Sequence, residues 1–268
     1  MHPLLVLDFS TEAVDDRNVP AHLVAIALLG AGIGFLGGML GKGGSAIATP
    51  LLVAMGVPPV VALAAPLPAT VPGTLVAADS YRRLGLIDRR VLTWSLVAGV
   101  PATIAGALLS KVVDAHELIL ATDAIILVLG LRMLLGHAQG AGDVAGHEQS
   151  IARISAVAVV VGLAGGLLAN SGGFLLAPLF IAVLGLPIKP ALGTSLAVAA
   201  VLAVPGTLVH LALGHLDMAV VMAFGVGSVP LSRVGARVAL RTDPSRLERG
   251  YGAALVALGA VFLLGALR

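Results

Sequence analysis

The chain has no cysteine and few charged side chains, and these absences exclude several classes of protein. Without cysteine, no disulfide, thiolate metal site or cysteine nucleophile can form. Asp, Glu, Lys and Arg make up 11% of the 268 residues, less than half of the roughly 25% that soluble domains carry. The formal net charge is only +2, and no basic block of the kind that binds nucleic acid is present. We therefore expect neither a soluble domain nor a nucleic-acid partner.

Apolar residues take the place of the missing charges. They account for 58% of the chain, and the mean hydropathy is +1.05. Most apolar stretches approach the length of about 20 residues that crosses a bilayer as a helix. The stretches fall at about 21–41, 45–57, 59–79, 91–110, 116–136, 151–169, 173–186, 188–213, 217–238 and 250–267. This pattern predicts an all-α polytopic membrane protein with about 8 full transmembrane helices and two short half-helices, the second and seventh stretches.

The same pattern divides the chain into four parts. We expect an acidic N-terminal tail over 1–20, a transmembrane repeat over 21–136, a linker over 137–150 and a second transmembrane repeat over 151–268. The tail lacks the basic start of a secretory signal. The longest polar stretch is too short and too rich in glycine to fold alone, so we predict no catalytic domain and no enzyme.

The two transmembrane parts repeat each other at a constant shift of 129 residues. Chance explains many matches of Ala, Leu and Gly, but matches of proline and aspartate over a hundred residues indicate duplication. The matched pairs are Gly37 with Gly166, Gly43-Gly44 with Gly172-Gly173, Gly56 with Gly185, Pro58 with Pro187, Gly85 with Gly214, Asp88 with Asp217, Pro101 with Pro230, Gly106 with Gly235 and Gly130 with Gly259. Pro50 matches Pro178 with a slip of one residue.

Arginine is distributed oppositely in equivalent loops of the two repeats. The loop near 80–90 holds four arginines, whereas its counterpart at 209–219 holds none. Residues 111–117 hold one lysine, whereas their counterpart region, residues 233–249, holds five arginines. Because cytoplasmic loops are rich in Lys and Arg, the repeats are predicted to have inverted topology, as in many secondary transporters. This places the linker in the cytoplasm and both termini outside the inner membrane.

Two glycine pairs interrupt long apolar stretches at equivalent positions, and they are the candidate binding site. Broken helices at membrane depth persist where they line a cavity. Each break exposes backbone N–H groups, and the half-helix that follows points the positive end of its dipole at the break. Such a site suits a small anion. The candidate substrate-binding residues around it are Lys42, Gly43, Gly44, Ser45, Asn170, Ser171, Gly172 and Gly173.

Other polar residues inside apolar stretches are weaker candidates. Thr194 and Ser195 fall in register with Ala65 and Pro66, opposite the glycine break if the halves fold alike, and we include both hydroxyls in the substrate site. The segment 66–74, with three prolines and two threonines, is a second candidate lining. Asp123 lies inside an apolar stretch and is the candidate for proton coupling. The histidines show no metal-ligand spacing, so we expect no metal and no cofactor.

These motifs resemble the TauE/SafE family, whose members are known as sulfite exporters. The shared pattern is Gly41-Lys42-Gly43-Gly44 followed by Pro50-Leu51-Leu52 and Gly56-Val57-Pro58, repeated as Asn170-Ser171-Gly172-Gly173, Pro178-Leu179 and Gly185-Leu186-Pro187. Gly193-Thr194-Ser195 and Gly235-Ala236-Arg237 also match family positions. The resemblance covers about 21–267. It implies export of sulfite, or of a related small sulfur-containing or carboxylated anion, across the inner membrane.

The sequence therefore predicts a secondary transporter or permease in the lipid bilayer, with a homodimer kept open as an assembly. Two alternatives of other classes stay open at this point. A permease or channel for metal or other cations would place carboxylate, methionine or histidine at the breaks, where this chain has Lys42. A membrane-embedded enzyme or assembly factor would need a convergent catalytic set within the spans, and the sequence offers only scattered ionisable residues.

Overall fold

The structure is a computed structural model, and it describes residues 19–41, 44–109, 126–135, 149–167 and 173–266. Over these residues the chain is helical, with no strand. The helices are α1 (Val19–Met39), α2 (Gly44–Ala54), α3 (Pro59–Ala64), α4 (Pro66–Arg82), α5 (Arg89–Leu109), α7 (Ile151–Leu167), α8 (Gly173–Ala182), α9 (Ile188–Ala212), α10 (Met218–Arg241) and α11 (Pro244–Ala266). Residues 126–134 are also helical.

Five helices in this part of the chain are long and apolar enough to cross a membrane. They are Pro20–Met39, Pro59–Arg82, Arg89–Leu109, Ile188–Ala212 and Met218–Arg241, and Ile151–Leu167 is a shorter apolar helix. An all-helical membrane fold is thus confirmed. Exposed leucines and valines along these helices fit an outer surface that contacts lipid.

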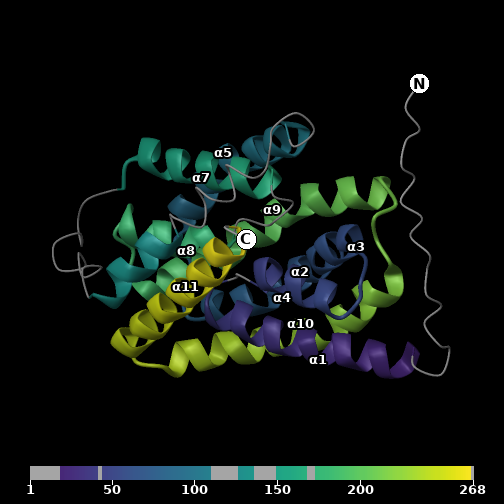
Figure 1. Cartoon of the computed structure of the whole chain (residues 1–268). Coiled ribbons are helices and arrows are strands. Elements are labelled where there is room, and N and C mark those ends of the chain that lie inside the picture. The colour runs from purple at the N-terminus through teal and green to yellow at the C-terminus, as the bar shows by residue number, and fades with distance from the viewer. Residues whose placement is uncertain (1–18, 42–43, 110–125, 136–148, 168–172, 267–268) are drawn as a thin grey trace.

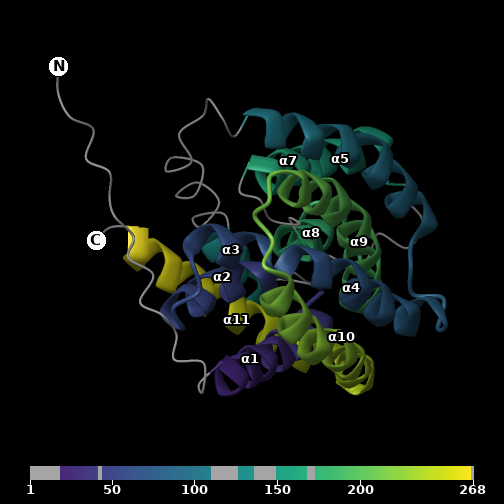
Figure 2. The same cartoon turned by 90° about the vertical axis from the view of Figure 1, so that its right-hand side faces the viewer.

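The long helices form two packed pairs with other helices between them. The α5–α7 pair lies on one side of the molecule and the α1–α10 pair on the opposite side. Helices α4 and α9 pack against each other between the pairs, together with the short helices α2 and α8 (Figures 1 and 2). Helix α4 also contacts α10, and α9 contacts α5.

Glycine brings the helices of each outer pair into backbone contact. A Cβ atom at Gly34 or Gly38 of α1 would collide with the carbonyl oxygen of Ser228 or Ser232 of α10. In the other pair, a Cβ atom at Gly166 of α7 would collide with the carbonyl oxygen of Thr103 of α5. Small residues allow such close approach between helices in membranes. Gly34, Gly38 and Gly166 are therefore among the points of closest helix packing in the two pairs.

These contacts also fix the relative directions of the helices. Along α1 and α10 the contacting residue numbers rise together, from Gly30 with Phe224 to Gly38 with Ser232, so the two helices run in the same direction. The same holds for α7 and α5. In contrast, α4 and α9 run in opposite directions, because Gly193 contacts Tyr81 whereas Gly206 contacts Leu67.

The apolar stretch at 59–79 divides into two helices rather than one. Helix α3 ends at Ala64 and α4 begins at Pro66, with Ala65 as the turn between them. Proline has no N–H to donate to the preceding turn, so the break falls where Pro66 and Pro68 begin the second helix. Both parts together still form a span of 24 residues.

Matched positions of the two repeats adopt the same local structure. At Gly85 and Gly214, φ is +68° and +70°, and each glycine ends a helix with the hydrogen bonds of a Schellman turn. Asp88 and Asp217 then cap the next helix: their Oδ1 atoms accept from the N–H groups of Val91 at 2.9 Å and Val220 at 3.2 Å. The residues that match at the 129-residue shift are therefore structurally equivalent at these turns.

Candidate functional site

Both short helices begin at the second glycine of a glycine pair. Gly44 is the first residue of α2, which has 11 residues, and Gly173 is the first residue of α8, which has 10. Ser45 is the second residue of α2. Five of the predicted site residues lie outside the described residues, as does Asp123: they are Lys42, Gly43, Asn170, Ser171 and Gly172. Their place in the site stays a prediction.

The start of α2 lies inside the molecule rather than at its end. The ring Nε2 of His22, at the start of α1, is 3.0 Å from the carbonyl oxygen of Met55, just after α2. Helix α2 therefore returns along α1 to the point where α1 began. At 1.5 Å per residue, α1 is about 31 Å long and α2 about 16 Å. Gly44 thus lies roughly halfway along α1.

Ser195 lies against the first glycine break. Its hydroxyl is 3.0 Å from the carbonyl oxygen of Gly41 and 2.9 Å from that of Leu192, and it can donate to one of them at a time. Gly41 has φ +70°, and a Cβ atom there would meet Leu192 and Ser195 side chains within 3 Å. The second half of the chain therefore packs directly onto the end of α1 beside the break.

Thr194 is fully buried and has a different partner. Its Oγ1 accepts a hydrogen bond from the backbone N–H of Asp88, at 3.0 Å. This bond ties the start of α9 to the turn before α5. Both predicted hydroxyls thus bond to protein groups, and their contact with substrate stays a prediction.

The structure contains a cavity between α1, α4 and α10, and the sequence predicts only its α4 side, the segment 66–74. It has a volume of about 20 Å³ and is lined by Ile33, Gly34, Gly37, Ala69, Thr70, Gly73, Thr74, Phe224, Ser228 and Ser232. The segment 66–74, predicted as a lining, supplies Ala69, Thr70, Gly73 and Thr74. Ser228 and Ser232 were missed. Their only signal is two hydroxyls four residues apart in an apolar helix, on one face of α10.

The hydroxyls of this cavity differ in their hydrogen bonds. Thr74 donates to the carbonyl oxygen of Thr70 at 2.7 Å, and Ser232 donates to that of Ser228 at 2.7 Å. Thr70 donates to Pro66 at 2.8 Å. The Oγ of Ser228 is buried and has no hydrogen-bond partner among the described residues. Of the four hydroxyls, that of Ser228 therefore has a proton that it does not donate to any described residue.

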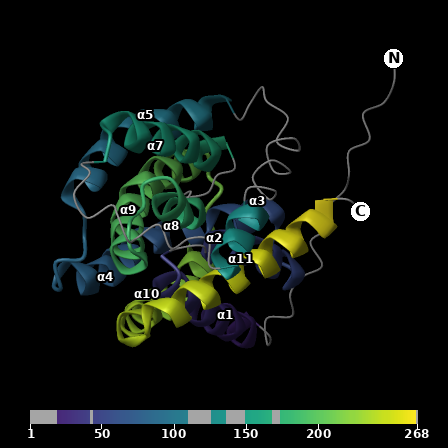
Figure 3. The ribbon, with the colours of Figure 1, turned by 90° about the vertical axis from the view of Figure 1, so that its left-hand side faces the viewer.

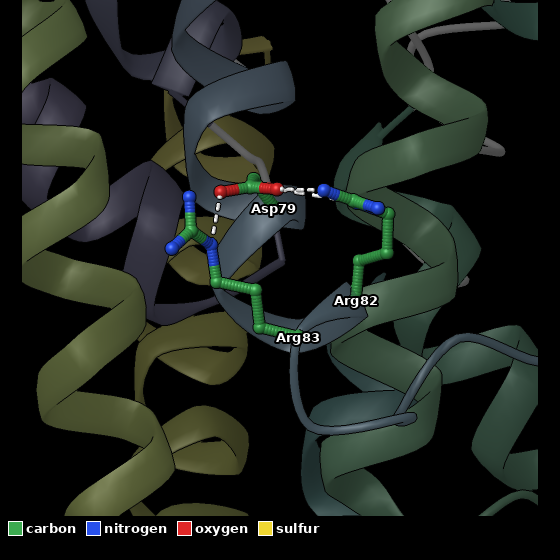
Figure 4. Close-up of polar contacts among 3 residues, drawn as sticks. All are labelled: Asp79, Arg82 and Arg83. Atoms are coloured by element: carbon green, nitrogen blue, oxygen red, sulfur yellow. Dashed lines mark hydrogen bonds and ion pairs between the residues drawn. The ribbon is translucent and has the colours of Figure 1, made fainter.

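Charge gathers at one end of the molecule, where α4 ends. Asp79 forms ion pairs there with Arg82 at 2.6 Å and Arg83 at 2.7 Å (Figure 4). The carboxylate lies beside two exposed arginines at the end of the span. Ion pairs in contact with solvent contribute little stability. The net positive charge of the two arginines and one aspartate suits a cytoplasmic loop.

The start of α9 and the end of α10 meet at the same end of the molecule. Lys189 Nζ donates to the carbonyl oxygen of Leu240 at 2.9 Å, where α10 passes toward α11 (Figure 3). Outside the spans, a hydroxyl hydrogen bond from Ser245 holds the pKa of Asp243 below its usual value, with help from the N–H groups of Ser245 and Arg246.

No group of three or more His, Asp or Glu side chains in the described part of the chain could hold a metal ion. The nearest arrangement is a pair: the Nδ1 atoms of His210 and His215 are 3.2 Å apart at the end of α9. Two nitrogen ligands are fewer than a structural metal site uses.

Comparison with known proteins gives one family and several relatives. Residues 26–262 match the family described as Sulfite exporter TauE/SafE. A probable membrane transporter protein of Xylella fastidiosa (strain 9a5c) is 29% identical over 255 residues, covering 89% of this chain and 94% of that protein. The probable membrane transporter protein YjnA of Bacillus subtilis (strain 168) is 24% identical over 237 residues, covering 84% and 93%. No solved structure matches the chain.

Proposed function

Because the chain belongs to the TauE/SafE family, we propose that it exports sulfite or a related small sulfur-containing or organic anion as a secondary transporter or permease. The family and the relatives make the chain a membrane transporter and not an enzyme. The choice of substrate is the proposal, and the cation permease is its rival.

The helix directions support two repeats of inverted topology, 21–136 and 151–268, joined by the linker 137–150. Helices α1, α4 and α10 run in one direction, since α10 contacts both of the others with rising residue numbers. Helices α5, α7 and α9 run the opposite way. In the 129-residue register, α1 corresponds to α7, α4 to α9 and α5 to α10. Each helix thus runs opposite to its counterpart, as in inverted-repeat transporters.

The observation that carries the anion site is the position of the two half-helix starts. Helices α2 and α8 begin at Gly44 and Gly173, so each directs its first N–H groups and the positive end of its dipole at a glycine break. Gly44 lies halfway along α1, and Ser195 of the other repeat packs beside the first break. In the proposed site, Lys42 supplies the charge, and Asn170, Ser171 and Thr194 supply further hydrogen bonds.

The membrane orientation follows from the arginine-rich end. Arg82, Arg83 and the end of α10 at Leu240 lie at the end of the molecule where α9 begins. We assign this end to the cytoplasm by the positive-inside rule, with both termini on the outer face of the inner membrane.

The test is a flux assay with the full chain in liposomes. Sulfite, sulfate and small sulfonates would be offered, with monovalent and divalent cations in parallel. Selective uptake of sulfite or another small anion supports the proposal. Cation flux without anion flux would reverse it in favour of the rival.

A lysine variant tests the site itself. Lys42→Ala should weaken anion binding by about 1.5–3 kcal/mol, the value of a hydrogen bond to a charged group. Lys189→Ala is the matched control, because it removes a lysine that bonds to the Leu240 carbonyl at the molecular end. Equal anion affinity in the wild type and the Lys42 variant would remove Lys42 from the site.

A further inference from the structure

We propose that the cavity between α1, α4 and α10 is a second substrate subsite, which receives one O–H group of the transported oxoacid. The inference rests on the proposed function and deepens it, since it adds a neutral hydroxyl-lined subsite to the charged one at the glycine breaks.

The size of the cavity restricts its occupant. About 10–15 Å³ of such volume holds one water molecule. At about 20 Å³, the cavity accepts one oxygen-sized group. It therefore suits a single oxygen of a small molecule.

The hydrogen bonds of the lining define the chemistry of that oxygen. Thr74 and Ser232 have given their protons to helix carbonyls, so their oxygens can only accept from a ligand. Ser228 is the reverse case, since only 5% of its surface is exposed and its hydroxyl has no partner among the described residues. A ligand oxygen that accepts a hydrogen bond from Ser228 and donates one to a neighbouring hydroxyl satisfies the free donor and a free acceptor of the cavity. That oxygen carries one proton.

The charge of the cavity lining agrees with this occupant. None of the lining residues is ionisable, so a multiply charged ion would lose its hydration without a counter-charge. A protonated, singly charged oxoacid loses less.

The lining is also specific to one side of the molecule, the side formed by α1, α4 and α10. At the 129-residue shift, Thr70 and Thr74 correspond to Ala199 and Ala203, and Gly73 corresponds to Leu202. Leu202 fills the equivalent space, since its Cδ2 lies 3.3 Å from the position of a Cβ atom on Gly99. Ser232 alone has a hydroxyl counterpart, Thr103, which donates to the Gly99 carbonyl oxygen at 2.9 Å. Three of the four hydroxyls and the open space therefore occur together on one side only.

The test compares two buried hydroxyls in the full-length protein in liposomes. Ser228→Ala removes the donor of the cavity, whereas Ser95→Ala removes a hydroxyl of α5 that is equally buried and unpartnered but does not line the cavity. Loss of one neutral hydrogen bond should raise the KM for sulfite about three- to tenfold in the Ser228 variant, with the Ser95 variant like the wild type.

A filling variant gives an independent measurement. A Cβ atom at Gly73 would stand 3.1 Å from Ser232 Oγ, a contact that the serine can relieve by rotating. Gly73→Ala should therefore fold, with a thermal midpoint near that of the wild type, and should also raise the KM.

The outcomes separate the two proposals. If the wild type carries no anion, the proposed function fails and the subsite with it. If the wild type carries sulfite and both cavity variants keep its KM, only the subsite is overturned. A changed thermal midpoint with unchanged KM would assign the O–H group to bound water instead, and it too would overturn the substrate subsite.

Discussion

The two flanks of the molecule are built from corresponding helices, yet one holds a cavity lined by hydroxyls where the other is solid, filled by the side chain of Leu202. We call α1, α4 and α10 the first flank, and α7, α9 and α5 the second. The first encloses the cavity with Ser228 and Gly73. The second has Gly99 and Leu202 at those positions, and the leucine covers the glycine. Equivalent positions thus keep the same helix packing, while one flank holds a cavity with the Ser228 hydroxyl and the other holds an apolar contact between Leu202 and Gly99.

The largest expected effect comes from removing the Leu202 side chain from the solid flank. Leu202→Ala should destabilise the protein by about 2–5 kcal/mol, because the buried side chain leaves a void that the helices cannot close. Unfolding in detergent, followed by helical circular dichroism, measures the loss. Leu208→Ala on the same helix is the control, since Leu208 is 59% exposed. Equal losses in the two variants would contradict the assignment of a packed flank.

The next effect concerns the glycines at which two helices of the same flank come into backbone contact. Gly106→Ala and Gly235→Ala should each cost about 1–3 kcal/mol, because the added methyl group strikes a carbonyl oxygen, that of Leu163 or Phe35. Gly32→Ala of α1 is the control, as nothing lies within 4 Å of its Cβ position. A large difference between Gly106→Ala and Gly235→Ala would show that the two flanks are packed less alike than their backbones suggest.

A smaller effect is expected at the helix caps. Asp88→Ala and Asp217→Ala should each lower stability by about 0.5–2 kcal/mol, through the loss of a side-chain acceptor for the first N–H groups of α5 and α10. The thermal midpoints of the two variants and of the asparagine variants, which retain an acceptor, provide the measurement. Asparagine variants as unstable as the alanine variants would argue against capping as the cause.

The smallest effect is a dependence on pH at the start of α11. The pKa of Asp243 is lower in the folded protein than its ordinary value because the Ser245 hydroxyl donates to the carboxylate at 2.6 Å. Its contribution is therefore present above pH about 4 and is lost as the pH falls through the folded pKa. The thermal midpoints of the wild type and Asp243→Ala should differ at neutral pH and converge in acid. A difference that grows in acid would contradict the sign.

The arrangement of spans and short helices was readable from the sequence because it depends on local signals. Apolar length predicts a span, and glycine followed by proline predicts a turn, so the short helices after both glycine pairs were expected and found. The break at Ala65 was missed, although Pro66 carries its signal. A proline can begin a helix as readily as kink one, and the sequence does not say which.

The contacts between the halves could not be predicted in the same way. Thr194 and Ser195 were predicted as ligand groups, and the structure shows their bonds to Asp88 and Gly41, more than a hundred residues away in the chain. Ser228 lines a cavity only because α10 packs against the helices of the other repeat. Periodicity within one helix identifies an apolar face but not the helix that covers it.

The two half-helices differ by one residue, and this offset has an angular consequence. Both start in the 129-residue register, but the proline is the seventh residue of α2 and the sixth of α8. Gly56 and Gly185 are in register again, since the turn after α8 is longer by one residue. In a helix of 3.6 residues per turn, one residue is a rotation of about 100°. Measured from the first residue of each helix, the proline of α8 therefore projects about 100° away from the direction that Pro50 takes on α2, although the two helix starts are in register.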